Sequence, residues 1–190
     1  MRPTEQTSSY QVIVLNGGSS SGKSRLAREL QKVLPDAWLS LSIDDLVDAM
    51  PPSLVDDGAG ISFGDQGEVS VGDGFGALEK AWMAGIAAMA RAGARILLDD
   101  VFLGGAQSQA RMRAQLDGLR VLWVGVRCDP AIAAERELAR GDRAPGMAAR
   151  QAEVVHEGVG YDLEVDTGTT GTPECARAIA ARVASGHNPA

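Results

Sequence analysis

Short apolar runs alternate along the chain with segments whose apolar residues recur at helical spacing. The apolar runs lie at 11–16, 38–41, 95–98, 120–126 and 161–165, and the helical patterns lie at 24–34, 44–50, 75–92, 106–116, 130–140, 148–157 and 173–183. Strands that are separated by helices pair in parallel, and helices then cover both faces of the sheet. The pattern predicts one three-layer α/β domain over residues 1–190, built on a central parallel sheet of about five strands.

Residues 51–74 interrupt this alternation. The segment holds a Pro-Pro pair, six glycines and several aspartates, and only 61–63 and 69–71 have an extended pattern. A glycine-rich insertion of this length in a compact domain is usually a functional cover or a disordered loop. Its apolar residues need a surface to pack on, so we expect a cover over the acceptor side of the active face.

Residues 17–24 complete the phosphate-loop pattern G-x-x-x-x-G-K-[ST] between the first apolar run and the first helical pattern. Glycines let the backbone wrap a phosphate, and loop N–H groups with a helix N-terminus favour an anion. We expect Lys23 to reach the β- and γ-phosphates of ATP and Ser24 to bind Mg²⁺. The pattern thus predicts a P-loop kinase-like fold. The expected nucleotide-binding residues of the loop are Gly17, Gly18, Ser19, Ser20, Ser21, Gly22, Lys23 and Ser24.

Two adjacent carboxylates, Asp99 and Asp100, end the apolar run that begins at residue 95. Carboxylates at this place hold Mg²⁺ through water in phosphoryl-transfer enzymes, so we expect at least one of them to serve the metal. The alternatives are a cap on the next helix or a pair with an arginine. Because neighbours on a strand face opposite ways, the two side chains are expected to have different roles.

Asp44 and Asp45 follow the second apolar run, which we expect to end at residue 43. Ligands sit at the carboxyl ends of parallel strands, so Asp44 is placed to accept a proton from an acceptor hydroxyl. The same position suits the N-cap of the following helix, and Asp45 is a rival for either role.

Residues 139–148 form a Gly- and Pro-containing break between two helical patterns and carry Arg140 and Arg143. An arginine loop that closes over phosphates excludes water and neutralises transition-state charge, so we expect a lid whose arginines act in catalysis, with Arg140 also binding the nucleotide. A solvated charged surface is the alternative. Residues 166–173 lie where a loop could contact adenine, although a plain turn has the same pattern.

The composition excludes several classes of protein. A net charge of −7 argues against a nucleic-acid partner, because phosphate contacts need a basic surface. No apolar run is long enough to span a bilayer, and residues 1–11 lack the apolar core of a signal peptide, so we expect a cytoplasmic protein without a membrane partner. Two cysteines and two histidines without metal-type spacing make a zinc site improbable.

The charge distribution limits the chemical class of the phosphoryl acceptor. Residues 44–79 contain nine acids and neither lysine nor arginine, so an anionic acceptor would be repelled there. We expect a neutral or weakly cationic small-molecule alcohol, unless arginines from elsewhere fold into the acceptor pocket. The candidate residues for its apolar binding surface are Met50, Leu54, Val55, Phe63, Phe75 and Trp82.

Several segments together resemble the chloramphenicol phosphotransferase family. They are 13–24, 44–51, 90–105, 121–129, 139–143 and 154–159, and the resemblance extends over roughly residues 12–183. It implies ATP- and Mg²⁺-dependent transfer of the γ-phosphate to the primary hydroxyl of chloramphenicol, which inactivates the antibiotic. It also implies that Asp44 is the catalytic base and that the lid arginines are Arg140 and Arg143. The chain departs from the family pattern at Ser21, at Asp45 and over 53–70.

Two other functions fit parts of the sequence. One is a kinase of the same architecture that phosphorylates a nucleotide sugar or another antibiotic. The other is a nucleotide-binding switch or an ATPase without a phosphoryl acceptor. A guanine-specific switch would need an Asn-Lys-x-Asp loop, and no Asn-Lys pair occurs in the chain.

Overall fold

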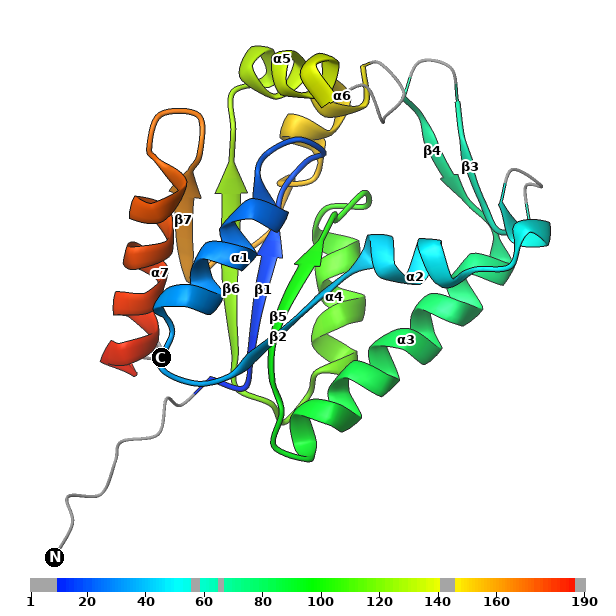
Figure 1. Cartoon of the computed structure of the whole chain (residues 1–190). Coiled ribbons are helices and arrows are strands. Elements are labelled where there is room, and N and C mark those ends of the chain that lie inside the picture. The colour runs from blue at the N-terminus through cyan, green and yellow to red at the C-terminus, as the bar shows by residue number, and fades with distance from the viewer. Residues whose placement is uncertain (1–9, 56–58, 65–66, 141–145, 187–190) are drawn as a thin grey trace, which may run out of the picture.

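The computed structural model describes residues 10–55, 59–64, 67–140 and 146–186. Five parallel strands run in the order β2-β5-β1-β6-β7, and β3 pairs separately with β4 (Figure 1). The strands are β1 (Val12–Asn16), β2 (Trp38–Ser42), β3 (Ile61–Phe63), β4 (Val69–Val71), β5 (Arg95–Asp100), β6 (Val121–Arg127) and β7 (Leu163–Asp166). The helices are α1 (Lys23–Val33), α2 (Ile43–Ala49), η1 (Pro52–Leu54), α3 (Asp73–Arg91), α4 (Ala106–Gln115), α5 (Pro130–Arg140), α6 (Met147–Val154) and α7 (Thr172–Ser185). The predicted α/β fold is confirmed.

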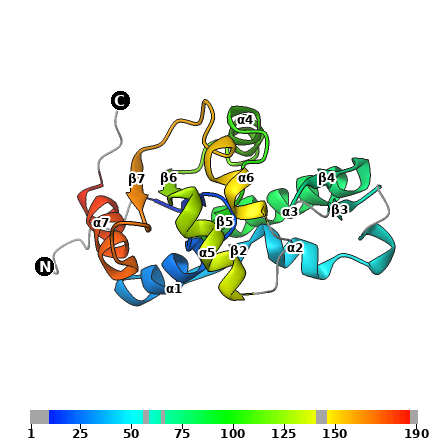
Figure 2. The same cartoon turned by 90° about the horizontal axis from the view of Figure 1, so that it is seen from above.

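Both faces of the sheet are covered, as Figure 2 shows from above. Ile13 and Leu15 of β1 pack with α1 and α7 on one face. Val12 and Val14 pack with α3 and α4 on the other face. Alternate residues of one strand therefore enter two cores, which explains why the run is apolar without interruption.

Strands β3 and β4 form a small antiparallel hairpin in which Ile61 pairs with Val71. Ile61 is buried in a separate apolar cluster with Leu46 of α2 and Phe75 of α3. The extended stretches expected at 61–63 and 69–71 are thus strands, and their apolar side chains anchor the hairpin beside α2 and α3.

The boundaries of several strands differ from the predicted ones by one or two residues. Strand β2 ends at Ser42, and Ile43 opens α2 instead of closing the strand. Strand β5 ends with Asp99 and Asp100, as predicted, so these acids belong to the sheet itself. Among the described residues, no helix is long and apolar enough to cross a membrane.

Candidate active site

The loop between β1 and α1 has the backbone conformation that a phosphate loop requires. Gly22 has a φ of 89°, and Ser20, at 57°, is the only non-glycine with positive φ among the described residues. A Cβ atom added to Gly17 would lie 2.5 Å from the carbonyl oxygen of Val126, so this position needs glycine. A non-glycine held at positive φ is strained, and such strain concentrates at functional sites.

The loop also holds polar groups that lack a partner. The Oγ atoms of Ser20 and Ser21 are buried and form no hydrogen bond in the described part of the chain. Buried hydroxyls are nearly always hydrogen-bonded, and an unsatisfied one points to a missing ligand or ion. The loop therefore fits the phosphates of a nucleotide, with Ser20 also lining the large cavity beside it.

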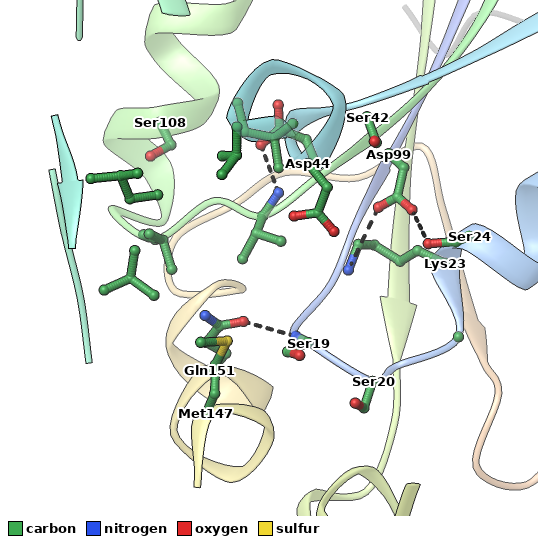
Figure 3. Close-up of a pocket in the computed structure, with 18 of the residues that line it drawn as sticks. Ser19, Ser20, Lys23, Ser24, Ser42, Asp44, Asp99, Ser108, Met147 and Gln151 are labelled. Carbon is green, nitrogen blue, oxygen red and sulfur yellow. Dashed lines mark hydrogen bonds and ion pairs between the residues drawn. The ribbon is translucent and has the colours of Figure 1, made fainter. Parts of the chain in front are cut away.

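The buried side chains of Lys23 and Asp99 form a polar cluster with the exposed Ser24 at the start of α1 (Figure 3). The Lys23 Nζ atom lies 2.9 Å from the Gly18 carbonyl oxygen and 3.7 Å from Asp99 Oδ1. The Ser24 hydroxyl donates to Asp99 Oδ2 at 2.7 Å. One hydroxyl and one carboxylate oxygen side by side are ligands of the type that Mg²⁺ prefers, with phosphate and water completing its shell.

Asp100 has a different environment from Asp99. Its Oδ1 accepts the Val101 N–H at 2.6 Å. Burial raises its pKa from 3.8 to about 7, and the negative charges of Glu79 and Asp99 act in the same direction. The expected difference between the two neighbours is thus present, and Asp99 is the one that contacts Ser24. The described residues contain no cluster of three or more acidic, His or Cys side chains that could hold a metal alone.

Asp44 and Asp45, the two acids after β2, have different surroundings. The sequence left open which of them would face an acceptor and which would serve the start of the helix. Ser42 is the N-cap of α2, and the Asp45 backbone N–H donates to its hydroxyl at 3.1 Å. The Asp45 carboxylate in turn accepts the Ser42 N–H at 2.7 Å, which completes a capping box. The N-cap expected at Asp44 or Asp45 is thus Ser42, and Asp45 completes the capping box from the third helical position, whereas Asp44 lines the cavity with the phosphate loop.

Strand register explains why Asp44 and the phosphate loop meet. Ser42 at the end of β2 pairs with Asp99 of β5, and Asp99 pairs with Leu15 of β1. The three strands end at one level, so the loop that follows β1 and the helix that follows β2 leave the sheet at the same edge, with β5 between them.

The cavity has a volume of about 950 Å³, large enough for a nucleotide phosphate and a small acceptor together. Of the predicted loop residues, Ser19, Ser20, Gly22, Lys23 and Ser24 line it. Gly17, Gly18 and Ser21 lie behind the lining, and the Ser21 carbonyl accepts a hydrogen bond from Thr167. Asp99, Asp100 and Arg140 also reach the cavity, and Arg143 lies outside the described residues.

The acceptor side of the cavity is apolar and is built from different residues than expected. Phe63 and Phe75 line it as predicted. The other apolar lining residues, which were not among the candidates, include Val47, Ile61, Val69 and Val71. The other four candidates were wrong as lining residues. Met50, Leu54, Val55 and Trp82 instead belong to the apolar cluster that holds the hairpin against α2 and α3.

Helices α5 and α6 stand over the carboxyl ends of the strands (Figure 1). The buried Glu137 of α5 accepts the N–H groups of Gly146 and Ala148, both at 2.8 Å, and so fixes the start of α6. Arg136 of α5 donates to the Thr167 carbonyl at 2.7 Å and lines the cavity. Thr172 also lines the cavity, so the 166–173 segment lies close enough to contact a bound ligand.

A polar network that sequence reasoning missed supports the loop from behind. Asn16 accepts the Phe102 N–H and donates to the Val155 carbonyl and to the Tyr161 hydroxyl. The Tyr161 hydroxyl lies 2.6 Å from Nδ1 of His156. Burial, followed by the positive charge of Arg127, lowers the pKa of His156 from 6.5 to about 4, so the ring is neutral and Nδ1 accepts. The only sequence signal for this network was Asn16 itself, a polar residue at the end of an apolar strand.

Further residues to which the sequence analysis assigned no role line the cavity, from α1, α3, α4, α5 and α6. They are Arg25, Arg28, Glu79, Ser108, Arg111, Arg136, Met147 and Gln151. Arg111, which donates to the Ser108 hydroxyl at 3.1 Å, shows that arginine does reach this cavity from α4. Arg127, in contrast, pairs with Glu164 and is not among the lining residues.

Known proteins resemble this chain in sequence. Two curated proteins of Mycobacterium tuberculosis, from strains CDC 1551 and H37Rv, carry the provisional name O-phosphotransferase. Each is 32% identical over 180 residues, which cover 88% of this chain and 80% of the relative.

Solved structures share the fold at lower identity. The tunicamycin resistance protein of Deinococcus radiodurans aligns with a TM-score of 0.65 and 20% identity, over 92% of this chain and 95% of that one. Shikimate kinase of Acinetobacter baumannii, in complex with shikimate, aligns with a TM-score of 0.61 and 14% identity, over 98% and 100% of the two chains.

The sequence model of chloramphenicol phosphotransferase-like proteins matches residues 10–184, nearly the whole chain. The phosphate loop, the buried lysine and the parallel sheet agree with that match. The chain therefore belongs to the chloramphenicol phosphotransferase-like family and is a phosphotransferase that acts on a small molecule.

Proposed function

We propose that the protein transfers the γ-phosphoryl group of ATP to a hydroxyl of a neutral small molecule, with chloramphenicol as the leading candidate for the acceptor. The observation that carries this proposal is the shared cavity: the phosphate loop and Asp44 line it together, with apolar side chains around them. Asp45 is engaged in the helix cap, so Asp44 is the acid of the pair that faces the reaction.

The phosphate loop side would bind the nucleotide. Lys23 supplies a buried cation for the phosphates, and Ser24 with Asp99 would hold Mg²⁺, which neutralises charge on the phosphates when bound. Asp100 is held by Val101 and would act less directly. Arg140 would approach the same phosphates from α5, and we propose the same role for Arg143.

The acceptor would lie between Asp44 and the hairpin. Its hydroxyl donates to the Asp44 carboxylate, which orients it for attack and takes its proton as the hydroxyl oxygen bonds to the γ-phosphorus of ATP and the bond from that phosphorus to the oxygen of the departing ADP breaks. Phe63, Phe75 and Val71 offer apolar contact for an uncharged body of the acceptor. The family match supports chloramphenicol, and the lack of any lysine or arginine on 44–79 supports a neutral acceptor. An arginine that reaches the cavity from elsewhere is Arg111 of α4, so the acceptor panel of the test includes anionic compounds.

The test is a product analysis with purified protein, ATP and Mg²⁺. Chloramphenicol and a panel of neutral alcohols, aminoalcohols, nucleotide sugars and nucleoside monophosphates are added separately, and products are identified by mass spectrometry. We expect a phosphate ester of chloramphenicol or of another neutral alcohol, and none with the Lys23→Met variant. Release of only ADP and phosphate would indicate an ATPase, and preference for an anionic acceptor would contradict the assignment of the apolar wall.

A further inference from the structure

Helix α6 brings a buried glutamine against the phosphate loop. Gln151 is 5% exposed, and its Oε1 accepts the backbone N–H of Ser19 at 2.8 Å (Figure 3). A Cβ atom added to Gly18 would lie 3.2 Å from the Gln151 Cβ, so helix and loop are in close contact. The residues are 132 positions apart in sequence, and only the fold brings them together.

The chemistry of this contact fixes the orientation of the amide. A backbone N–H can only donate, so the atom of Gln151 that faces Ser19 is the oxygen. The Nε2 amino group, a donor, is consequently turned away from Ser19 (Figure 3). Gln151 lines the cavity, and among the described residues none accepts a hydrogen bond from Nε2.

The helix that carries Gln151 is held at both ends. Glu137 accepts the N–H groups of Gly146 and Ala148 at its start. Asn16 donates to the Val155 carbonyl at its end, at 2.8 Å. A side chain on a helix tied at both ends has little freedom to move, which is the condition for a group that positions a reacting atom.

Helix α6 also marks the border between the two sides of the cavity. A Cβ atom added to Gly67 would lie 2.4 Å from the Met147 backbone nitrogen, and Glu68 pairs with Arg150 at 2.9 Å. The helix thus contacts the phosphate loop through Gln151 and the hairpin through its first turn. The phosphoryl group must cross this border during transfer.

We propose that Gln151 positions the γ-phosphoryl group: Ser19 anchors the amide oxygen, and Nε2 donates to a γ-phosphate oxygen. The inference rests on the proposed ATP-dependent transfer. It assigns a neutral donor at the end of the nucleotide nearest the acceptor, in addition to the cation of Lys23. A donor at this point holds the phosphorus in line with the acceptor hydroxyl.

The decisive variant is Gln151→Glu, which keeps an oxygen for the Ser19 N–H but replaces the donor with a negative oxygen. Binding of ADP and of the non-hydrolysable analogue AMPPNP, each with Mg²⁺, is measured by titration calorimetry. We expect Gln151→Glu to weaken AMPPNP binding about ten- to a hundred-fold and ADP binding less than about three-fold, because only AMPPNP carries the γ-phosphate.

Two further variants complete the experiment. Gln151→Met, which has a similar length and no polar group, is expected to weaken AMPPNP about three- to ten-fold relative to ADP. Glu153→Gln, an exposed position on the same helix, is the control and should leave the ratio of the two affinities unchanged. Thermal unfolding of each variant verifies the fold, and Gln151→Met decides the question if Gln151→Glu does not fold.

Three outcomes would overturn the inference. Equal losses for ADP and AMPPNP would mean that Gln151 only supports the loop. Unchanged affinities with a raised KM for the acceptor would place the donor on the acceptor instead. If the unaltered protein binds neither nucleotide, the proposed function itself fails, which is distinct from a failure confined to Gln151.

Discussion

The two sides of the cavity are constructed in opposite ways. The phosphate side is a single loop of eight consecutive residues whose backbone is fixed by Gly17, Gly22 and the strained Ser20. The acceptor side is assembled from the hairpin, α2, α3 and α4, and its residues Phe63 and Val71 remain 39% and 53% exposed. The phosphate side is thus defined by the backbone of one loop, and the acceptor side by individual side chains from several elements.

This difference follows from what each side has to recognise. Phosphates are the same in every nucleotide, so backbone N–H groups and one lysine suffice, and their geometry admits little variation. An acceptor varies in shape, and apolar contacts on a hairpin can change without disturbing the sheet. Changes to the phosphate side should therefore alter chemistry and stability together, whereas changes to the exposed side chains of the acceptor side should alter selectivity alone.

Asp44, where the two sides meet, should give the largest effect. Asp44→Asn keeps the shape of the side chain but removes the proton acceptor, so kcat should fall about 10²- to 10⁴-fold. Nucleotide affinity should stay within about three-fold, because the proposed role of Asp44 is toward the acceptor hydroxyl and not toward the phosphates. Steady-state kinetics and nucleotide titration measure the two quantities.

Asp45→Asn is the matched control for this variant. It weakens the capping box with Ser42 and should lower the free energy of unfolding by about 0.5–2 kcal/mol. Its kcat should remain near that of the unaltered protein. Near-normal kcat for Asp44→Asn, or an equal loss for both variants, would contradict the division of roles between the two acids.

Lys23 on the phosphate side should show the coupling of chemistry and stability. Lys23→Met is expected to lower kcat about 10²- to 10³-fold and to weaken nucleotide binding. It also leaves Asp99 buried without its cation, which should cost about 3–5 kcal/mol in denaturant unfolding.

The double variant Lys23→Met with Asp99→Asn separates the two effects. Both charges of the buried pair are gone, so most of the stability should return. Activity should not return, because neither the cation proposed to bind the phosphates nor the carboxylate proposed to hold Mg²⁺ is restored. Recovery of activity would show that Lys23 serves only to neutralise Asp99.

Phe63 on the acceptor side should affect selectivity with little effect on stability. Phe63→Ala removes apolar contact from the hairpin, and the KM for the acceptor should rise about ten-fold. The KM for ATP and the melting temperature should change little, since Phe63 is part-exposed. Ile61→Ala, at a buried neighbour with 4% exposure, should instead cost about 2–5 kcal/mol of stability. A raised KM for ATP in Phe63→Ala would contradict the proposal that the two sides bind nucleotide and acceptor separately.

The smallest effect concerns the network behind the phosphate loop. His156 has a pKa of about 4 in the folded protein, against 6.5 when unperturbed. Between these values the unfolded chain binds a proton that the folded protein does not, so the free energy of unfolding should fall as the pH drops from 6.5 toward 4. Above 6.5 the contribution is fully present. His156→Gln should remove this part of the pH dependence, as urea unfolding at several pH values would show; an unchanged slope would mean that other groups cause it.

Features that depend on residues close together in sequence could be predicted, and features that depend on contacts between distant residues could not. The order of strands and helices followed from apolar spacing, and the phosphate loop from eight adjacent residues. The contacts of Gln151 and Asn16 could not be predicted, because their partners lie 132 and 139 residues away and one polar residue on a helix or strand has no distinctive pattern.

The candidate acceptor residues show the same limit. Apolar residues such as Met50 and Trp82 have the composition of a binding surface, but they equally suit a core. Only the packing of the hairpin shows that Met50 lies inside the cluster and that Phe63 faces the cavity. The choice between Asp44 and Asp45 also needed the hydrogen bonds of Ser42, since both acids occupy the same place in the sequence pattern.

The capping box of α2 has a consequence for how this protein can evolve. Because Ser42 and Asp45 satisfy each other, the helix start does not draw on the neighbouring Asp44. Substitutions at position 45 can therefore raise or lower thermal resistance while Asp44, the carboxylate proposed to react, stays in place. Two adjacent aspartates thus let folding and turnover be selected independently, within a single turn of helix.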